Sequence, residues 1–287
     1  MVRMQSFPLS NGTSMPSIGL GVYLVNDVAE CEASVETALR VGHRLIDTAA
    51  IYGNERAVGR GIAASGVPRE EVFLTTKVWV SDFGYAKTEQ AITKSLERLG
   101  TDYVDLLLLH QPFGDVVGSW KAMEEAVGRG TVRSIGVSNF LISDLEKILA
   151  VAKIKPVINQ VERHPYSAQE DLSAFHATHD IVGEAWYPLG HGSKELLGEP
   201  VFTELATKYG KGPAQIILRW HIQSGFIAIP KSTDAAHIAQ NFDIFDFALT
   251  DDEMARIDVL DRNRPSFRVP RWVMSAGTRI APVRDRG

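Results

Sequence analysis

The chain alternates short apolar runs with longer amphipathic stretches eight times, and this alternation is the strongest constraint on its fold. The apolar runs have the length of β-strands, and the amphipathic stretches have the period of helices. Because strands separated by helices pair in parallel, eight such units predict a (β/α)8 barrel, a TIM-barrel α/β fold. The predicted strands are 18–20, 44–46, 72–76, 103–109, 132–137, 157–161, 181–185 and 226–229. The predicted helices lie near 28–41, 54–65, 86–99, 118–129, 142–151, 168–178, 212–224 and 234–241, with an irregular insert after the seventh strand.

Composition is typical of one large domain without disulfides. The chain has 287 residues, 45% of them hydrophobic, and a formal net charge of −5, with no basic excess to favour nucleic acid. Its single cysteine, Cys31, excludes an intrachain disulfide and favours a reducing cytoplasm. The N-terminus lacks the apolar core of a signal peptide, and no apolar run has the length of a membrane span. We expect a cytoplasmic protein of one domain over residues 1–287, a monomer or weak oligomer, without membrane or nucleic-acid partners.

Two features lie outside the alternating pattern. Near the start, Asn11-Gly12 separates two short apolar runs, and this dipeptide predicts a β-hairpin over residues 5–17. At the other end, residues 262–287 hold seven arginines and one acid, a charge of +6. This segment is either a solvated tail or a C-terminal loop over the active site, the latter because apolar groups such as Trp272 interrupt the arginines.

Three predicted strand ends and the turn after one of them carry side chains suited to proton transfer. Asp47, Lys77 and His110 directly follow three of the apolar runs, and Tyr52 follows Asp47 by five residues. Chemistry in parallel barrels lies at the rim where the strands end. A nearby ammonium favours the phenolate of a tyrosine, so Lys77 is expected to make Tyr52 a better proton donor, while Asp47 holds Lys77. His110 is placed to polarise a carbonyl oxygen, and the group as a whole suits carbonyl reduction.

The later strand exits suit a nicotinamide cofactor. Asn139 and Gln160 carry amides that pair with a carboxamide through both a donor and an acceptor. Trp186 offers a flat face for an aromatic ring. Lys231 and Ser232, with Asn241 further on, suit a phosphate.

Seven segments of the chain resemble the aldo-keto reductases, in the family's order from about residue 9 to 260. They are DTAAIYGNE at 47–55, TKVW at 76–79, LHQP at 109–112, IGVSNF at 135–140, NQVE at 159–162, AWYPLG at 185–190 and IPKS at 229–232. The segment at 186–192 is most similar to the microbial diketogluconate reductase and prostaglandin F synthase-like branch. The resemblance implies a barrel that binds NADP(H) without a Rossmann domain and reduces carbonyl compounds, as an NADP(H)-dependent carbonyl reductase or alcohol dehydrogenase.

The resemblance also assigns roles to residues. It implies that Asp47, Tyr52, Lys77 and His110 are the catalytic tetrad. It implies nicotinamide contacts at Ser138, Asn139, Gln160 and Trp186. The full set of expected cofactor contacts adds Gly21, Val22, Tyr187, Leu189, Lys231, Ser232, Thr233, His237, Gln240 and Asn241. The expected substrate contacts are Tyr23, Trp79, Gln111 and Trp272, and no metal ligand is expected.

The chain departs from the family pattern at two places. Five residues after Ser232, where the family commonly has an arginine for the 2′-phosphate, it has His237, with Asp234 between them. Histidine lacks the permanent charge and the bidentate fork of arginine, so we predict NADP(H) use with a relaxed preference and measurable activity with NAD(H). Gln111 stands where a tryptophan often follows the catalytic histidine, which predicts a more polar or open substrate pocket.

Other folds and functions remain as alternatives. A doubly wound sheet needs a glycine-rich turn directly after a strand, whereas Gly59-Arg60-Gly61-Ile62-Ala63-Ala64 lies within a predicted helix, where helix–sheet packing explains its glycines. A non-catalytic NADP(H)-sensing barrel, similar to channel β-subunits, is the main functional alternative. A metal-dependent hydrolase needs clustered ligands, but His176 and His179 lie in a predicted helix and are expected to face solvent. A glycosidase needs paired carboxylates at strand exits, and only Asp47 is clearly so placed.

Overall fold

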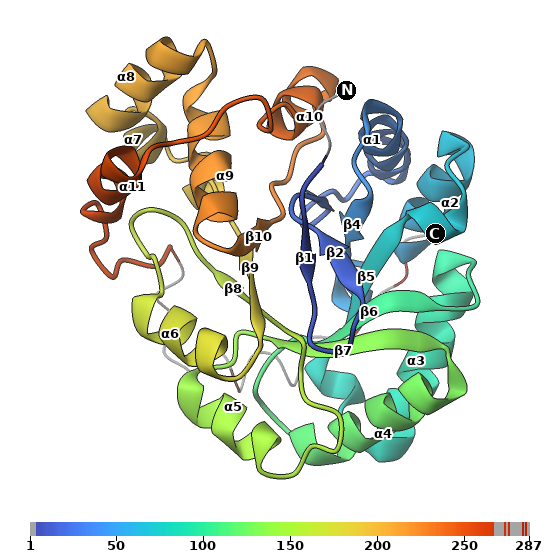
Figure 1. Ribbon diagram of the computed structural model, residues 1–287. Coiled ribbons are helices and arrows are strands. Elements are labelled where there is room, and N and C mark those ends of the chain that lie inside the picture. Colours follow the sequence, from blue (N-terminus) through green and yellow to red (C-terminus); the bar gives the residue numbers. More distant parts are fainter. Residues whose placement is uncertain (1–3, 267–272, 274, 276–282, 284, 286–287) are drawn as a thin grey trace.

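Eight parallel strands form the central sheet, and helices surround it (Figure 1). The description comes from a computed structural model that describes residues 4–266, 273, 275, 283 and 285. The sheet strands are β3 (Leu20–Gly21), β4 (Leu45–Asp47), β5 (Phe73–Val78), β6 (Val104–Leu109), β7 (Val132–Ser138), β8 (Ile158–Glu162), β9 (Val182–Trp186) and β10 (Phe226–Ala228). They pair in sequence order from β3 to β10.

The sheet closes on itself between its first and last strands. Ile18, just before β3, forms a parallel bridge with Ala228 of β10. The Gly19 amide donates to the Ala228 carbonyl at 3.0 Å, and the Ala228 amide donates to the Ser17 carbonyl at 3.0 Å. The expected (β/α)8 barrel is therefore confirmed, with every strand of the central sheet paired on both sides.

The helices follow the predicted order, with three additions. The longer α-helices between strands are α1 (Val28–Val41), α2 (Glu55–Ser65), α3 (Tyr85–Leu99), α4 (Val116–Arg129), α5 (Ile142–Leu149), α6 (Glu170–Thr178), α9 (Pro213–Gln223) and α10 (Ala235–Phe242). The insert after β9 contains α7 (Lys194–Leu197) and α8 (Pro200–Tyr209), and α11 (Asp251–Asp258) follows the barrel. Short 3-10 turns are η1 (Ala50–Tyr52), η2 (Arg69–Glu71), η3 (Val80–Asp82) and η4 (Gly190–Gly192). No helix among the described residues is long and apolar enough to cross a membrane.

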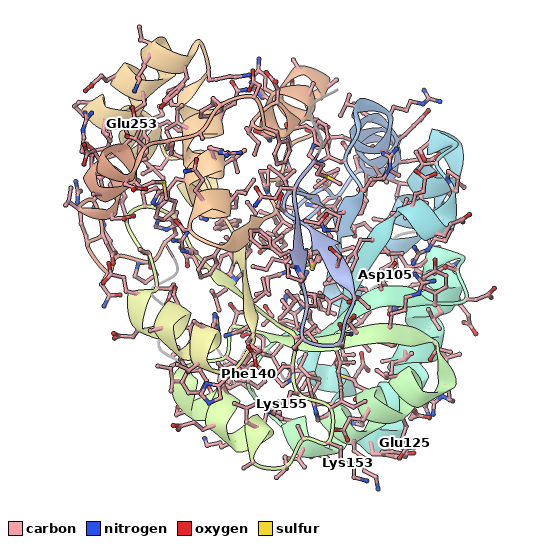
Figure 2. All side chains as sticks on the ribbon, in the orientation of Figure 1. Asp105, Glu125, Phe140, Lys153, Lys155 and Glu253 are labelled. Carbon is pink, nitrogen blue, oxygen red and sulfur yellow. The ribbon has the colours of Figure 1, made fainter. Side chains whose placement is uncertain are left out.

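The added helix α11 is fixed to α8 by one acidic side chain. Glu253 accepts hydrogen bonds from Lys208 Nζ and Tyr209 Oη, each at 2.6 Å. Figure 2 labels Glu253 among the side chains of this part of the molecule. These bonds lower the pKa of Glu253 to about 2 against the opposing effect of its burial. The sequence pattern did not predict α11, because most of its residues are charged and its apolar face is narrow.

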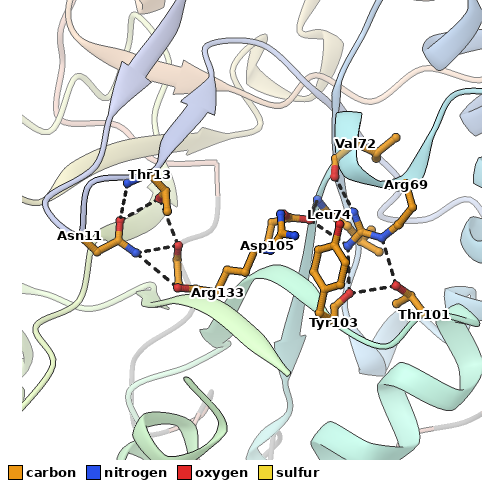
Figure 3. A network of polar contacts seen from close by, with 10 residues as sticks. Asn11, Thr13, Arg69, Val72, Leu74, Thr101, Tyr103, Asp105 and Arg133 are labelled. Carbon is orange, nitrogen blue, oxygen red and sulfur yellow. Dashed lines mark hydrogen bonds and ion pairs between the residues drawn. The ribbon is translucent and has the colours of Figure 1, made fainter. Parts of the chain in front are cut away.

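The N-terminal hairpin closes the amino end of the barrel. β1 (Ser6–Pro8) pairs with β2 (Ser14–Pro16), and both cross in front of the large sheet in Figure 1. In its turn, Asn11 Nδ2 donates to Ser134 Oγ of β7 at 2.9 Å (Figure 3). At the same end, Asp105 accepts from Arg69 at 2.8 Å and from Arg133 at 3.1 Å, which ties β6 and β7 to the loop before β5. The hairpin prediction is confirmed.

Side chains inside the barrel lie in layers set by the strand period of two. The layer nearest the hairpin is apolar and includes Leu45, Leu108 and Ile158, with Leu9 and Met15 from the hairpin side. The residue two positions further along each strand points to the same side. Those next inward positions are polar: Asp47 after Leu45, His110 after Leu108, and Gln160 after Ile158. The period of two therefore places polar side chains at the carboxyl end of the barrel and apolar side chains at the end covered by the hairpin.

The glycines of α2 serve contacts between helices, which corrects the expected helix–sheet packing. A Cβ on Gly59 would lie 2.3 Å from the carbonyl oxygen of Leu99 in α3, and one on Gly61 would lie 2.6 Å from the carbonyl oxygen of Glu32 in α1. Both distances are too short for a real Cβ contact, and both neighbours are backbone atoms that cannot rotate away. The two glycines therefore let α1, α2 and α3 approach one another closely around the barrel.

We expect Gly59→Ala to destabilise the fold, although alanine is the better helix former. Overpacking against the Leu99 carbonyl is expected to cost about 1–3 kcal/mol. Gly128→Ala in α4 is the matched control, because a Cβ there meets nothing within 4 Å, and it is expected to stabilise the fold by about 0.5–1 kcal/mol. Urea denaturation of both variants measures the difference, and equal effects of the two substitutions would contradict the packing argument.

Candidate active site

Lys77 and Asp47 form a buried ion pair inside the barrel, on the neighbouring strands β4 and β5. Lys77 Nζ donates to Asp47 Oδ1 at 2.5 Å and to the Thr48 carbonyl oxygen at 2.8 Å, and the lysine side chain is fully shielded from solvent. Burial raises the pKa of Asp47, whereas Lys77 and the Gln160 amide act in the opposite direction. The expected contact between Asp47 and Lys77 is present.

Tyr52 is placed by the short turn η1 and by the asparagine that follows it. Asn54 is buried, donates to the carbonyl oxygens of Val22 and Val25 at 3.0 and 3.2 Å, and accepts from Thr48 Oγ1 at 2.9 Å. These bonds tie the loop after β4 to the loop after β3. Lys77 Nζ then lies 5.2 Å from the centre of the Tyr52 ring. Sequence reasoning quoted Asn54 within a motif but gave it no role.

The pKa of Tyr52 differs from the expected direction. It lies well above the ordinary value of 10, because burial disfavours the phenolate and because Asp47 adds a nearby negative charge. Tyr23, Tyr187 and Glu184 act in the same direction. The lowering predicted from Lys77 is thus outweighed, since Lys77 is already paired with Asp47. In this site Tyr52 keeps its proton as a phenol.

His110 lies against two aromatic rings at the exit of β6. Its ring centre is 5.6 Å from that of Tyr52 and 5.0 Å from that of Trp79, both in edge-on contacts. Burial lowers the pKa of His110 well below 6.5, and the Lys77 ammonium acts in the same direction, so the imidazole is neutral. Its Nδ1 is buried without a hydrogen-bond partner among the described residues. A neutral ring retains one N–H that donates to a ligand.

The expected nicotinamide contacts lie together on the adjoining strands β7, β8 and β9. Trp186 Nε1 donates to Asn139 Oδ1 at 3.0 Å, and Asn139 Nδ2 donates to the His110 carbonyl oxygen and to Ser138 Oγ, each at 3.1 Å. Asn139 adopts a left-handed backbone with φ of 64° directly after β7. Gln160 Nε2 donates to Asp47 Oδ2 at 2.8 Å, which connects this group to the tetrad.

Glu184 is a site residue that the sequence reasoning missed. It lies on β9 opposite Gln160 of β8, is fully buried, and accepts from Gln160 Nε2 at 2.8 Å. Burial raises its pKa to about 8, and the charge of Asp47 acts in the same direction. The available signal was a carboxylate inside an apolar run at 181–185, since buried strands rarely carry an unpaired charge.

The expected phosphate contacts follow β10 at the start of α10. Lys231, His237 and Gln240 are exposed, whereas Asn241 is buried. Asp234 is the N-cap of α10 and accepts from the His237 amide at 2.8 Å. This bond lowers the pKa of Asp234, so the residue places a negative charge at the helix N-terminus.

The remaining expected cofactor contacts lie beside these groups. Gly21, the last residue of β3, donates from its amide to the Pro230 carbonyl oxygen at 3.1 Å, and the amide of Val22, directly after β3, donates to the Asp47 carbonyl oxygen at 3.1 Å. Tyr187 contacts Trp186 edge-on, with ring centres 4.9 Å apart and ring planes at 71°. Ser232 and Thr233 are half-buried between Lys231 and the start of α10, and Leu189 packs under the insert.

Three of the four expected substrate contacts surround the tetrad. The Tyr23 ring centre lies 5.0 Å from that of Tyr52 and 6.2 Å from that of Tyr187, so Tyr23 lies between these two tyrosines. Trp79 packs on His110, and Gln111 is buried beside it. Trp272 lies outside the described residues, as does most of the expected C-terminal loop.

The described ends of that C-terminal segment contact the rim at two separate places. The Ser266 amide donates to Glu162 at the exit of β8, and Asp285 pairs with Arg56 of α2 at 2.8 Å. Burial alone would raise the pKa of Glu162. The hydrogen bonds from His164 and Ser266 outweigh this effect, so the pKa of Glu162 lies below its ordinary value. Whether residues between these ends cover the site stays a prediction.

His176 corrects the expectation that the helix α6 histidines face solvent. Its ring is buried, with Nε2 3.0 Å from Asn159 Nδ2 of β8. Burial lowers its pKa to about 4. His179 stacks on Phe175 with ring centres 4.0 Å apart. His176 therefore packs on the buried face of α6 together with Leu172, and His179 packs at the C-cap of the helix.

Comparison with known proteins decides the family. A model of the aldo/keto reductase family matches residues 8–262, which include all four tetrad positions. The chain belongs to the aldo/keto reductase family. This aldo-keto reductase is 47% identical to morphine 6-dehydrogenase of Pseudomonas putida over 267 residues, covering 88% of the chain and 90% of the relative.

Further relatives support the branch suggested by residues 186–192. The aldo-keto reductase is 48% identical to the 9,11-endoperoxide prostaglandin H2 reductase of Trypanosoma cruzi, with 89% and 91% of the two chains covered. It is 44% identical to methylglyoxal reductase DkgA of Escherichia coli, with 89% and 93% covered. The predicted diketogluconate reductase and prostaglandin synthase-like branch is thereby confirmed.

Solved structures agree with the barrel. The aldo/keto reductase of Brucella melitensis has a TM-score of 0.86 and 45% identity, covering 90% of this chain and all 100% of that one. A Bombyx mori aldo-keto reductase solved in complex with NADP has a TM-score of 0.90 and 36% identity, covering 95% and 98% of the two chains. The fold is thus shared along nearly the whole chain.

We expect Lys77→Met to destabilise this aldo-keto reductase strongly. The substitution leaves the buried Asp47 carboxylate without its cation, a change that costs about 3–5 kcal/mol in comparable buried pairs. The double variant Lys77→Met, Asp47→Asn removes both charges and is expected to recover part of the loss. A double-mutant cycle from denaturant unfolding gives the coupling, and additive effects would contradict a direct interaction in the folded state.

Proposed function

We propose that this aldo-keto reductase reduces aldehydes or ketones to alcohols with NADPH as the hydride donor, in the class of carbonyl reductases and alcohol dehydrogenases. One observation carries the proposal: the Tyr52 ring lies 5.2 Å from the Lys77 ammonium and 5.6 Å from the neutral His110 ring, at the carboxyl end of the barrel. A protonated phenol, a paired ammonium and a neutral imidazole suit proton delivery to a carbonyl oxygen.

The roles proposed for the tetrad follow from these protonation states. Tyr52 donates its proton to the carbonyl oxygen, and its high pKa keeps that proton in place until negative charge develops there. Lys77 stabilises the phenolate that remains, and Asp47 holds Lys77 in position at 2.5 Å. His110 donates an N–H hydrogen bond to the carbonyl oxygen and polarises it. A bound nicotinamide supplies the hydride to the carbonyl carbon.

The residues on β7 to β9 fit a nicotinamide. Trp186 is half-buried, and its hydrogen bond from Nε1 to Asn139 fixes the orientation of its ring. Ser138, Asn139 and Gln160 are proposed to bind the carboxamide. Lys231 and Ser232 are proposed to bind a phosphate. The other proposed cofactor contacts are Gly21, Val22, Tyr187, Leu189, Thr233, His237, Gln240 and Asn241.

Further features stay proposals at this stage. Tyr23, Trp79 and Gln111 are proposed to contact the substrate because they surround the tetrad, and Trp272 is proposed with them from the sequence. We also propose that residues 1–287 act as one cytoplasmic barrel domain, monomeric or weakly oligomeric, with a small carbonyl compound as its partner. The alternative of a non-catalytic NADP(H) sensor is not favoured by a family whose relatives carry reductase names.

Replacing Tyr52 tests the proposed proton donor. Tyr52→Phe keeps the ring that packs on His110 but removes the hydroxyl, so kcat for aldehyde reduction should fall by about 10²–10⁴-fold while NADPH still binds. Steady-state NADPH consumption and tryptophan fluorescence titration measure the two effects. Tyr85→Phe is the matched control, because the Tyr85 hydroxyl, on the exposed surface of α3, bonds Glu125, and it should retain activity within about tenfold. A near-normal kcat in Tyr52→Phe would remove Tyr52 from this role.

Asp234 and His237 support the proposed relaxed cofactor preference. The Asp234 side chain already caps the amide of His237, and both side chains are exposed. His237 Nδ1 lies 3.8 Å from Asp234 Oδ1, so the imidazole faces a carboxylate. An ionised carboxylate at this helix N-terminus repels a 2′-phosphate and accepts from a ribose hydroxyl.

We expect kcat/KM for NADPH to exceed that for NADH by less than about a thousandfold, roughly 4 kcal/mol. His237→Arg should increase this ratio by at least about tenfold, because arginine adds a permanent charge and a bidentate fork. His237→Gln is the control that changes the side chain without adding charge. A wild-type ratio above a thousandfold would contradict the relaxed preference.

A further inference from the structure

The barrel interior holds a second carboxyl group that the proposed reaction does not use. Glu184 lies in the middle of β9 and is fully shielded from solvent. Its Oε2 accepts from Gln160 Nε2 at 2.8 Å, the same nitrogen that donates to Asp47 Oδ2 at 2.8 Å. The two carboxyl oxygens therefore lie no further apart than twice this distance.

This arrangement uses both N–H groups of the Gln160 side chain. A primary amide has two hydrogens on nitrogen, and one goes to each carboxyl group. Its oxygen, Oε1, accepts no hydrogen bond within the described part of the chain. Glu184 and Asp47 together therefore fix which way the amide is turned, and they leave its oxygen as the group available to a ligand.

The charges in this layer do not balance if every group ionises. Asp47 and Glu184 are two carboxyl groups, and among the described residues Lys77 is the one ammonium that acts on them. Only Asp47 is bonded to Lys77. The second oxygen of Glu184, Oε1, is buried and has no partner among the described residues. Like charges this close in a low dielectric do not both ionise readily, so the carboxyl group without a cation retains its proton.

We propose that Glu184 is a positioning residue that orients the Gln160 amide and stays protonated at neutral pH, so that the polar layer beneath Tyr52 carries no net charge. The inference rests on the proposed function, because the proposed role of Gln160 is to bind the nicotinamide carboxamide. The groups that face Glu184 are Asp47 on β4, Lys77 on β5, Gln160 on β8 and, at the rim, Tyr52.

The protonation state of Glu184 has a direct consequence for Tyr52. A negative Glu184 raises the pKa of Tyr52 further. It would therefore make the phenol a weaker acid and slow proton donation to a carbonyl. Burial raises the pKa of Glu184 to about 8, so this change is expected in the mildly alkaline range.

The first test measures folding against pH. A carboxyl group whose pKa is higher in the folded state than in the unfolded state binds its proton more tightly in the folded protein. Its contribution to the free energy of unfolding is complete below the unfolded-state pKa and is lost as the pH rises through the folded-state pKa. Glu184→Gln mimics the protonated acid and does not titrate. Relative to wild type, its folding equilibrium constant should increase by up to about tenfold per pH unit between pH 5 and 8 and then level off.

Glu253→Gln is the matched control, a buried carboxyl group on α11 whose pKa is lowered on folding. Its stability relative to wild type should not vary between pH 6 and 9. If Glu184→Gln also shows a constant difference over this range, the proposal that Glu184 holds a proton is overturned. Should Glu184→Gln fail to fold, Glu184→Met serves for the same comparison, since it is uncharged and similar in length.

The second test measures turnover against pH. The ratio of kcat for Glu184→Gln to kcat for wild type should be near one at pH 6 and should rise to at least about threefold at pH 9, because only the wild type gains the extra negative charge. A ratio that stays flat from pH 6 to 9 counts against the proposal. A wild-type chain without any carbonyl-dependent NADPH consumption would instead overturn the proposed function, and the folding test would still decide the state of Glu184.

The third test separates positioning from a general structural role. Glu184→Met removes one acceptor from Gln160 and frees the amide to turn, so the Kd for NADPH should increase by about tenfold. Glu184→Gln retains an acceptor oxygen and should restore a Kd close to that of wild type. Equal Kd values for wild type and Glu184→Met would overturn the positioning role.

Discussion

The buried contact between Lys77 and Asp47 is the interaction on which the site depends. An ammonium and a carboxylate inside a barrel are tolerated only when each has partners, because their loss of hydration is costly. Four strands supply the hydrogen-bonded side chains of this group: Asp47 on β4, Lys77 on β5, Gln160 on β8 and Glu184 on β9. Only a closed barrel brings these strands around one axis, so closure through Ile18 and Ala228 is also a condition for the site.

The apolar layer below this polar layer gives it a low dielectric. The hairpin carries Leu9 and Met15 against the barrel interior, and hydrogen bonds from Asn11 fasten its turn to β7. The resulting burial explains the protonation states of the rim. It keeps Tyr52 a phenol and His110 a neutral imidazole, which are the forms that donate hydrogen bonds and protons to an oxygen.

The side chains at the two ends of the proposed cofactor site differ in how strongly hydrogen bonds restrict them. Asn139 and Trp186 are held by hydrogen bonds to each other and to the His110 region, which leaves little freedom at the nicotinamide end. At the other end, Lys231 and His237 are exposed and Asp234 makes local contacts at the start of α10. In the proposed site, the groups at the nicotinamide end are therefore fixed by the barrel, whereas those at the phosphate end are exposed side chains.

The sequence by itself determined the eight strand–helix units and the hairpin, because the period of strands and the turn at Asn11-Gly12 are local properties. It also placed Asp47, Lys77, His110 and Trp186 at or next to strand ends, and their catalytic and cofactor roles stay predictions. It did not determine that Glu184 shares Gln160 with Asp47, that Gly59 packs on α3, or that His176 is buried. It also predicted the wrong direction for the pKa of Tyr52. These features arise from contacts between segments far apart in the chain, and burial and charge depend on everything that surrounds a group, which only the tertiary structure decides.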